Sequence, residues 1–257
     1  MLDRNAFSSP AFGVQIGGGT EVVTVTGNTV DGTRNGGGFL LPGANRMTIS
    51  GNLVRYNNGP GFRVSGGSES VIIEGNEVVS NTVGIEVRDA TTLDTVVRFN
   101  SIYQNGATGL GGVGSGVGVA VSDAQRTQVE ENTITGNLGA GVHVQGSATQ
   151  TQVRANFIVN NALGVLVGAP VGGPLTPPYP QQTQILNNSI SGNGIPPGDP
   201  FPVDETLLGR GIVLNPETPT GGVASNPNND IDPPLQSSLR MSAAGVLTGQ
   251  VNTTGAP

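Results

Sequence analysis

Short stretches of alternating apolar and polar residues repeat at a fixed interval along most of this chain. The copy at 132–153 reads N-T-I-T-G-N, then G-V-H-V, and finally T-Q-V. Alternation with a period of two is typical of a strand that buries one face and exposes the other. Each repeat holds three such stretches, so the pattern predicts three short strands per repeat.

Asparagine marks the length of the repeat. One row of asparagines recurs with steps of 24, 24, 24, 32, 24 and 32 residues, at Asn28, Asn52, Asn76, Asn100, Asn132, Asn156 and Asn188. Two repeats therefore carry an insertion of eight residues. One repeat cannot bury its apolar face alone, so successive repeats must stack as coils. The sequence predicts an all-β fold, a single-stranded parallel β-helix of about eight coils over residues 1–215.

A second row of asparagines follows the first at a distance of five residues, at Asn57, Asn81, Asn105, Asn137, Asn161 and Asn193. Asparagine tolerates the left-handed backbone of a tight turn, and identical amides on stacked strands can hydrogen bond to one another. We therefore expect both rows to form ladders that belong to the scaffold and do not bind ligands.

The positions that point outward carry the variation between coils. Glu74, Arg98, Glu130 and Arg154 alternate in sign on successive coils, and opposite charges on adjacent strands stabilise their pairing. A neighbouring row ends in Gln128, Gln152 and Gln184, whose amides can form a ladder of their own. We interpret these rows as a stabilised surface, with a glycan-binding face as the alternative.

Composition and charge narrow the classes of function. The 257 residues include 42 Gly and 18 Pro, which suits a chain that turns every few residues. The net charge is −7, every basic residue is Arg, and no basic stripe occurs, which argues against nucleic acid as a partner. No apolar run is long enough to span a membrane. No signal peptide or N-terminal capping helix is evident, so we expect the chain to begin part-way through a longer protein.

Three outward residues of the G-x-x-V strands are candidates for catalysis. Arg63 and Glu86 lie on adjacent coils and are expected to pair. His143 is the only histidine and is expected to be exposed on a sheet face. A general acid or base needs a partner within hydrogen-bond reach, and Glu86 is two coils away from His143, so a solvated histidine is the preferred interpretation.

Two aspartates depart from the repeat at one turn. Asp89 and Asp123 take the same place on adjacent coils, and Asp94 lies in the same loop as Asp89. Carboxylates this close can hold Ca²⁺ through oxygen ligands, or act as the pair of a retaining glycosidase. The alternative is that each aspartate caps its own turn.

The insertions are the other places where a solenoid can carry function, and they occupy 106–116, 168–182 and 194–209. The second contains Tyr179, an aromatic ring suited to stacking on a sugar. The third contains Asp204 and Glu205, with Arg210 close by, and so combines acid and base. Residues 216–257 are expected to form a C-terminal cap or linker and the start of a following β module, with a strand or hairpin over 240–251.

The coil pattern over 13–214 resembles the right-handed parallel β-helix superfamily of pectin lyase-like proteins. The segments N-D-I-D-P-P-L-Q at 229–236 and G-Q-V-N-T-T-G-A-P at 249–257 resemble large secreted bacterial surface proteins. The resemblance implies a right-handed helix, an extracellular or cell-surface location, and a polysaccharide or cell-surface glycan as a partner. The resemblance does not identify a function, because lyases, hydrolases, epimerases and inert stalks share the fold.

The motifs expected of enzymes in this superfamily are missing. The sequence has no D-D, G-H-G or R-I-K of polygalacturonase-like enzymes and no D-P-H of uronan epimerases. A lyase that uses Arg as base with Ca²⁺ bound by Asp89 and Asp123 stays open. The sequence favours a non-catalytic stalk or adhesin segment that could bind glycans. The alternatives are a lyase or hydrolase acting on acidic polysaccharide, and a phage-type tail spike or receptor-binding fibre.

Overall fold

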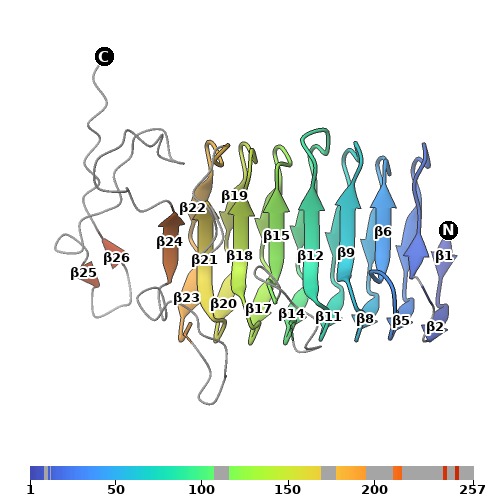
Figure 1. Cartoon of the computed structure of the whole chain (residues 1–257), viewed down its shortest axis with the longest axis horizontal. Helices are drawn as coiled ribbons and strands as arrows, with labels where there is room; N and C mark the ends of the chain where they lie inside the picture. Colours follow the sequence, from blue (N-terminus) through green and yellow to red (C-terminus); the bar gives the residue numbers. More distant parts are fainter. Residues whose placement is uncertain are drawn as a thin grey trace.

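The computed structural model describes residues 1–8, 11, 13–106, 116–168, 178–194, 211–215, 240–241 and 247–248. Their strands form three parallel sheets of eight strands each, and the coils follow one another along a single long axis (Figure 1). The predicted all-β parallel β-helix with three strands per coil is confirmed. No helix long and apolar enough to cross a membrane occurs in this part of the chain.

Each coil contributes one strand to each sheet. Sheet A contains β1 (Leu2–Asp3), β4 (Thr24–Thr26), β7 (Thr48–Ser50), β10 (Ile72–Glu74), β13 (Val96–Arg98), β16 (Gln128–Glu130), β19 (Gln152–Arg154) and β22 (Gln184–Leu186). Sheet B contains β2 (Ala6–Ser8), β5 (Thr29–Asp31), β8 (Leu53–Arg55), β11 (Glu77–Val79), β14 (Ser101–Tyr103), β17 (Thr133–Thr135), β20 (Phe157–Val159) and β23 (Ser189–Ser191). Sheet C contains β3 (Val14–Gln15), β6 (Phe39–Pro42), β9 (Pro60–Ser65), β12 (Val83–Arg88), β15 (Val119–Ser122), β18 (Ala140–Gln145), β21 (Leu163–Gly168) and β24 (Ile212–Asn215).

Two further strands, β25 (Arg240–Met241) and β26 (Leu247–Thr248), pair antiparallel where the sequence predicts a strand or hairpin. Most of the proposed cap and following module at 216–257 lies outside the described residues. The division of the chain into a helix and a C-terminal segment therefore stays a prediction.

The core is a column of inward side chains that repeat from coil to coil. The middle residue of each three-residue strand points inward, as with Ile73, Val97 and Val129 of sheet A, and all three are fully buried. Sheet C adds the two largest core side chains, Phe39 and Phe62, whose rings stack with their centroids 5.2 Å apart. Because the side-chain period of a strand is two, the flanking residues of each strand point outward.

The main asparagine row forms the ladder that the sequence predicts. The side-chain amide of Asn76 donates to Asn100 Oδ1 at 3.0 Å, and its backbone N–H donates to the same oxygen at 2.9 Å. The amide also donates to the backbone carbonyls of Ile49 at 2.9 Å and Glu74 at 3.1 Å. The same contact joins Asn100 to Asn132 across an insertion, so the extra residues leave the coil without changing its register.

The ladder begins one coil earlier than the sequence pattern shows. Asn5 donates to Asn28 Oδ1 from its backbone N–H and from its side-chain amide, both at 2.9 Å. The step from Asn5 to Asn28 is 23 residues, so Asn5 falls outside the 24-residue period. The second ladder runs from Asn57 to Asn193, and the backbone N–H of Thr33 donates into its start.

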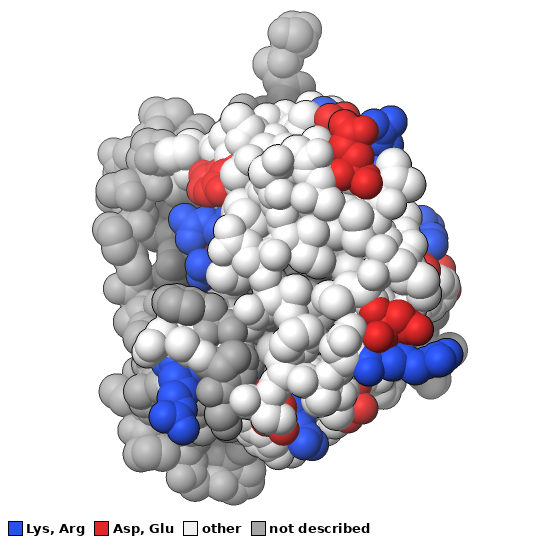
Figure 2. Space-filling model, turned by 90° about the vertical axis from the view of Figure 1, so that its right-hand side faces the viewer, with Lys and Arg blue, Asp and Glu red and all other residues white. Residues whose placement is uncertain are grey.

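The alternating charges on sheet A are paired, as predicted. Arg98 contacts Glu74 at 2.7 Å, and Arg154 contacts Glu130 on the next two coils. Seen along the axis from the N-terminal end, basic and acidic side chains lie beside one another around the rim, and the middle of the end face is uncharged (Figure 2). A partly exposed pair such as Arg98 with Glu74 stabilises a fold by about 1 kcal/mol or less, so its main effect is on register.

Replacing one rung of the main ladder should destabilise the protein more than replacing its first residue. In Asn100→Ala the N–H of Asn76 loses its acceptor, and the carbonyls of Ile73 and Arg98 lose a donor. Because the site is buried, we expect the free energy of unfolding to fall by about 2–4 kcal/mol. Chemical denaturation followed by circular dichroism measures the change.

Asn5→Ala is the matched control. Asn5 is exposed and its side chain only donates, to Asp3 and Asn28, so the loss should stay below about 1 kcal/mol. Equal losses in the two variants would contradict the view that buried, fully bonded amides hold the coils together.

Candidate functional site

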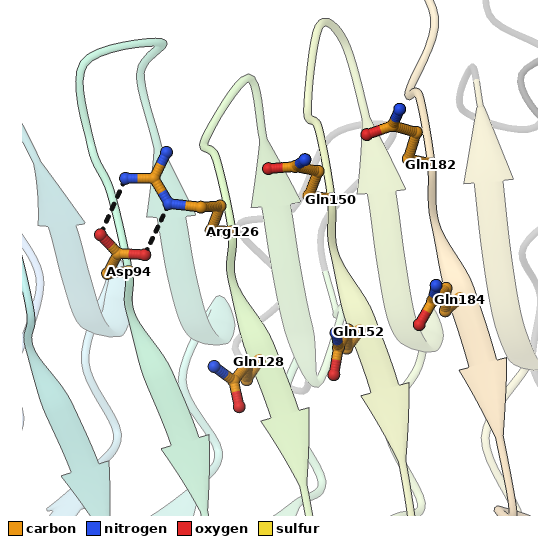
Figure 3. Close-up of a pocket in the computed structure, with 7 residues that line it drawn as sticks. All are labelled: Asp94, Arg126, Gln128, Gln150, Gln152, Gln182 and Gln184. Carbon is orange, nitrogen blue, oxygen red and sulfur yellow. Dashed lines mark hydrogen bonds and ion pairs between the residues drawn. The ribbon is translucent and has the colours of Figure 1, made fainter.

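An open groove runs across the coils on the outer surface of sheet A. It has a volume of about 530 Å³ and is lined by Asp94, Arg126, Gln128, Gln150, Gln152, Gln182 and Gln184 (Figure 3). The groove contains five glutamines and one acid–base pair. Among the described residues no aromatic or aliphatic side chain lines it, so the polar groups that it offers are mainly amides.

One row of the groove comes from the strands of sheet A. Gln128, Gln152 and Gln184 are in register on β16, β19 and β22. The next residue on two of these strands, Val129 or Val153, is fully buried. The alternation of the strand therefore holds the glutamines outward over a rigid core.

The other row comes from the corner that precedes each strand. Asp94, Arg126, Gln150 and Gln182 take successive coils there, and all four have a positive φ between 53° and 56°. This left-handed conformation turns the chain sharply between an isolated bridge and the strand. The two rows thus run side by side, with the corner row above the strand row in Figure 3.

The glutamine amides are not joined to one another. Within the described part of the chain, no side-chain hydrogen bond is formed by any of the five. The expected ladder over Gln128, Gln152 and Gln184 is therefore wrong, although the strands are in register. The physical reason is that a ladder asparagine is enclosed by backbone partners, whereas these longer side chains reach into solvent.

The corner row was missed by the sequence reasoning, although a signal for it exists. The segments R-T-Q at 126–128, Q-T-Q at 150–152 and Q-T-Q at 182–184 repeat on three successive coils. In each, the first and third residues line the groove and the threonine between them points away from it. Both rows can be found in the sequence if the corner residue before each strand of sheet A is counted as outward, together with the first residue of the strand.

An ion pair closes one end of the groove. Arg126 donates from Nε to Asp94 Oδ1 at 2.7 Å and from Nη2 to Asp94 Oδ2 at 2.8 Å. These hydrogen bonds hold the pKa of Asp94 below its ordinary value and raise the pKa of Arg126. Asp94 is a predicted calcium ligand, and here both of its carboxylate oxygens are engaged by a guanidinium.

Asp89 and Asp123 lie at the same turn on adjacent coils, and their carboxylates are engaged on opposite sides. Asp89 Oδ2 accepts from the backbone N–H of Gly66 at 2.9 Å on the preceding coil. Asp123 Oδ1 accepts from the backbone N–H and hydroxyl of Ser147, at 2.8 and 2.9 Å, on the following coil. Each of these carboxylates thus bonds the turn of a neighbouring coil, whereas the capping alternative predicts a bond to its own turn.

A calcium site is not assembled from the three predicted aspartates. Among the described residues no group of three or more histidine and carboxylate side chains is placed to hold a metal ion. Asp89 and Asp123 bind neighbouring turns, and Asp94 binds Arg126. The proposal of Ca²⁺ at these residues thus rests on the sequence alone.

Arg63 and Glu86 form the predicted ion pair on sheet C. Arg63 Nε lies 2.6 Å from Glu86 Oε2, and Arg88 approaches the other oxygen of Glu86 at 3.7 Å. Arg88 also contacts Asp89 at 3.2 Å. Each of these charges is compensated by a neighbour, and their role as catalytic candidates stays a prediction.

His143 is buried, so the expectation of an exposed histidine is wrong. Only 2% of its surface is exposed, and its row neighbours Ala120 and Leu166 are also buried. Its Nε2 lies 3.0 Å from the carbonyl oxygen of Gly168 and donates to it. Burial lowers the pKa of His143 to about 4, against a smaller opposing effect of this hydrogen bond. The reasoning failed because it treated every outward position of a sheet as facing solvent.

Of the predicted ligand-binding residues in and near the insertions, the structure describes only Tyr179. Tyr179 is described and only 8% exposed, so little of its ring is open to a ligand in solution. Asp204, Glu205 and Arg210 lie outside the described residues. Their proposed part in binding stays a prediction.

Comparison with known proteins agrees with the architecture. The family described as the right-handed beta helix region matches residues 1–117. The crystal structure of the periplasmic alginate epimerase AlgG is 17% identical and has a TM-score of 0.58, with 81% of this chain and 48% of that chain covered. The chain thus spans about half the length of AlgG. A comparison with curated proteins found no match.

Two other solved structures are similar. The A-module of the Azotobacter vinelandii mannuronan C-5 epimerase AlgE6 is 18% identical, covers 82% of this chain and 57% of its own, and has a TM-score of 0.52. The enzymatically active domain of tailspike protein 2 from bacteriophage CBA120 is 11% identical, covers 64% and 23%, and has a TM-score of 0.51. These identities show the fold alone, and they confirm the resemblance to right-handed parallel β-helix proteins.

The buried histidine predicts a specific dependence of stability on pH. The folded-state pKa of about 4 lies below the ordinary value of 6.5, so the unfolded chain takes up the proton first as the pH falls. The stability associated with a neutral His143 is therefore complete above about pH 6.5 and is lost between there and about pH 4, with a size on the order of 3 kcal/mol.

His143→Leu should remove this part of the pH dependence, since leucine already fills the equivalent place at position 166. The free energy of unfolding, measured by urea titration at about pH 7.5 and about pH 5, should fall less in the variant than in the wild type. Parallel losses in the two proteins would show that His143 is protonated without cost in the folded state.

Proposed function

We propose that this right-handed parallel β-helix is a non-catalytic segment of an extracellular stalk or adhesin that binds glycans in the groove on sheet A. The observation that supports the proposal is the double row of five glutamine amides, held outward on a rigid sheet and without hydrogen-bond partners among the described residues.

The chemistry of the two rows suits a polyol. A glutamine amide offers two donors and an acceptor, and a sugar hydroxyl is both donor and acceptor. Neither group is charged, so bringing them together costs less desolvation than burying an ion. Equivalent amides recur at the strand spacing of about 4.8 Å, so a chain lying along the helix axis would meet a similar set of groups on each coil.

The same argument sets the expected strength of binding. Each hydrogen bond contributes about 0.5–1.5 kcal/mol, and ordering one long side chain costs about the same. One glutamine therefore yields little net affinity, and several coils must act together. We expect a dissociation constant between roughly micromolar and millimolar, as for a surface that works by repeated contacts.

We propose a non-catalytic role because the candidate catalytic residues are buried or already bonded to other groups of the protein. Asp89 and Asp123 accept hydrogen bonds from neighbouring turns, and His143 is buried and uncharged near neutral pH. Arg63 and Glu86 neutralise one another. The runner-up is a polysaccharide lyase, for which the accessible Arg88 beside Glu86 would be the group to examine.

The proposed extracellular location rests on resemblance. Two of the similar structures are a periplasmic alginate epimerase and a bacteriophage tailspike. We extend this setting, outside the cytoplasm, to the present chain. A tailspike or other receptor-binding fibre is the further alternative, and it would present the same groove to a cell-surface glycan.

Gln128→Ala combined with Gln184→Ala should weaken glycan binding. Removing one amide from each end of the strand row deletes about 1–3 kcal/mol of hydrogen bonding, and the side-chain ordering that is no longer needed offsets part of it. We expect a loss of roughly three- to tenfold in affinity. Isothermal titration against a panel of neutral and acidic oligosaccharides measures the effect. Absorbance of unsaturated uronate is followed in the same samples.

Thr133→Ala combined with Ser189→Ala is the matched control, because these residues lie outward on the same two coils but on sheet B. The control should bind as the wild type does. Binding that survives in the glutamine variant would place the site elsewhere. Release of unsaturated uronate by the wild type would replace the non-catalytic proposal with a lyase.

A further inference from the structure

We propose that the groove on sheet A selects uncharged glycan chains over uronate chains. This inference rests on the proposed function and names the class of ligand that the groove would take. Two of the similar structures are an alginate epimerase and a mannuronan C-5 epimerase, so the inference differs from a ligand class assigned by similarity alone.

The first observation is the charge of the lining. Of the seven residues five are neutral amides, and the other two are Asp94 and Arg126. Two hydrogen bonds at 2.7 and 2.8 Å join these two side chains, so the guanidinium already has a carboxylate in its bidentate position. A uronate carboxylate entering the groove would have to displace Asp94 or lie close to its negative charge.

The second observation is that the neighbouring surface, as far as the structure describes it, offers no substitute cation. Arg98 and Arg154 are the other basic residues on the outer face of sheet A within these coils, and each is paired with a glutamate. Arg63 and Arg88 on sheet C are also paired with carboxylates. A metal ion could also bridge the protein and a uronate. The described residues, however, include no cluster of carboxylates placed to hold one.

The third observation is the charge of the whole chain. A net charge of −7 repels a polyanion before contact is made. This repulsion extends over a Debye length of about 8 Å at physiological ionic strength, and longer in dilute buffer. An uncharged chain meets none of these costs and finds the same five amides.

The test compares a ligand with its own neutral form. Oligogalacturonate and the same oligosaccharide with its carboxyl groups methyl-esterified share one backbone and differ in charge. In low-salt buffer the wild type should bind the ester roughly tenfold more tightly than the acid. Added salt should narrow the difference by strengthening binding of the acid, since it screens the repulsion.

Asp94→Asn tests the local part of the argument. The change frees Arg126 to pair with a uronate, so the preference for the ester should fall several-fold. Asp31→Asn makes the same change in charge and frees Arg55 in the same manner, but on sheet B, and it should leave the preference unchanged. Circular dichroism of both variants verifies that they fold.

The outcomes separate this inference from the proposed function. The inference is supported if the wild type prefers the ester and this preference falls in Asp94→Asn but not in Asp31→Asn. Binding of the acid at least as tightly as the ester, lost in the Gln128→Ala and Gln184→Ala variant, overturns the inference and leaves a glycan-binding groove. If neither form binds, or if the glutamine variant binds both normally, the proposed function fails and the inference fails with it.

Discussion

The stacking of asparagine on asparagine is the interaction on which the rest of the structure depends. Each ladder amide bonds to the next coil, to its own coil and to the preceding one, as Asn76 does with Asn100, Glu74 and Ile49. These groups are buried, so a slip of one coil against another would leave several of them without partners. The ladders therefore hold the register even where an insertion interrupts the period.

A fixed register turns each outward position into a row. Residues far apart in the chain, such as Gln128, Gln152 and Gln184, become neighbours because their strands pair in order. What a row does then depends on the length and charge of its members. Glutamate and arginine on successive coils neutralise each other, whereas glutamines held in the same way keep their amides for solvent or a ligand. The scaffold is constant, and the chemistry of the surface is set by single substitutions in each coil.

This division explains how much the sequence could predict. The repeat, the two ladders and the ion pairs of Glu74 with Arg98 and of Arg63 with Glu86 follow from spacing alone, since pairing of parallel strands transfers spacing directly into contact. The direction of a side chain beyond its Cβ does not follow. Asp89 and Asp123 occupy equivalent turns on adjacent coils, yet one carboxylate bonds the preceding coil and the other the following coil. His143 is outward by register and is nevertheless covered. Spacing says nothing about what lies over a sheet.

The groove shows why fold and function separate so cleanly on this scaffold. The similar structures share the coils at identities of 11 to 18%, so the likeness is one of fold and carries no surface chemistry with it. In this chain the outward charges of sheet A are neutralised within the protein, and the groove that remains is lined by amides. Such a groove offers no unpaired charge to an ionic ligand, so the selectivity that we propose comes from the pattern of hydrogen bonds and from the exclusion of ions. In the function that we propose, recognition is therefore a property of two rows of side chains and not of the β-helix that carries them.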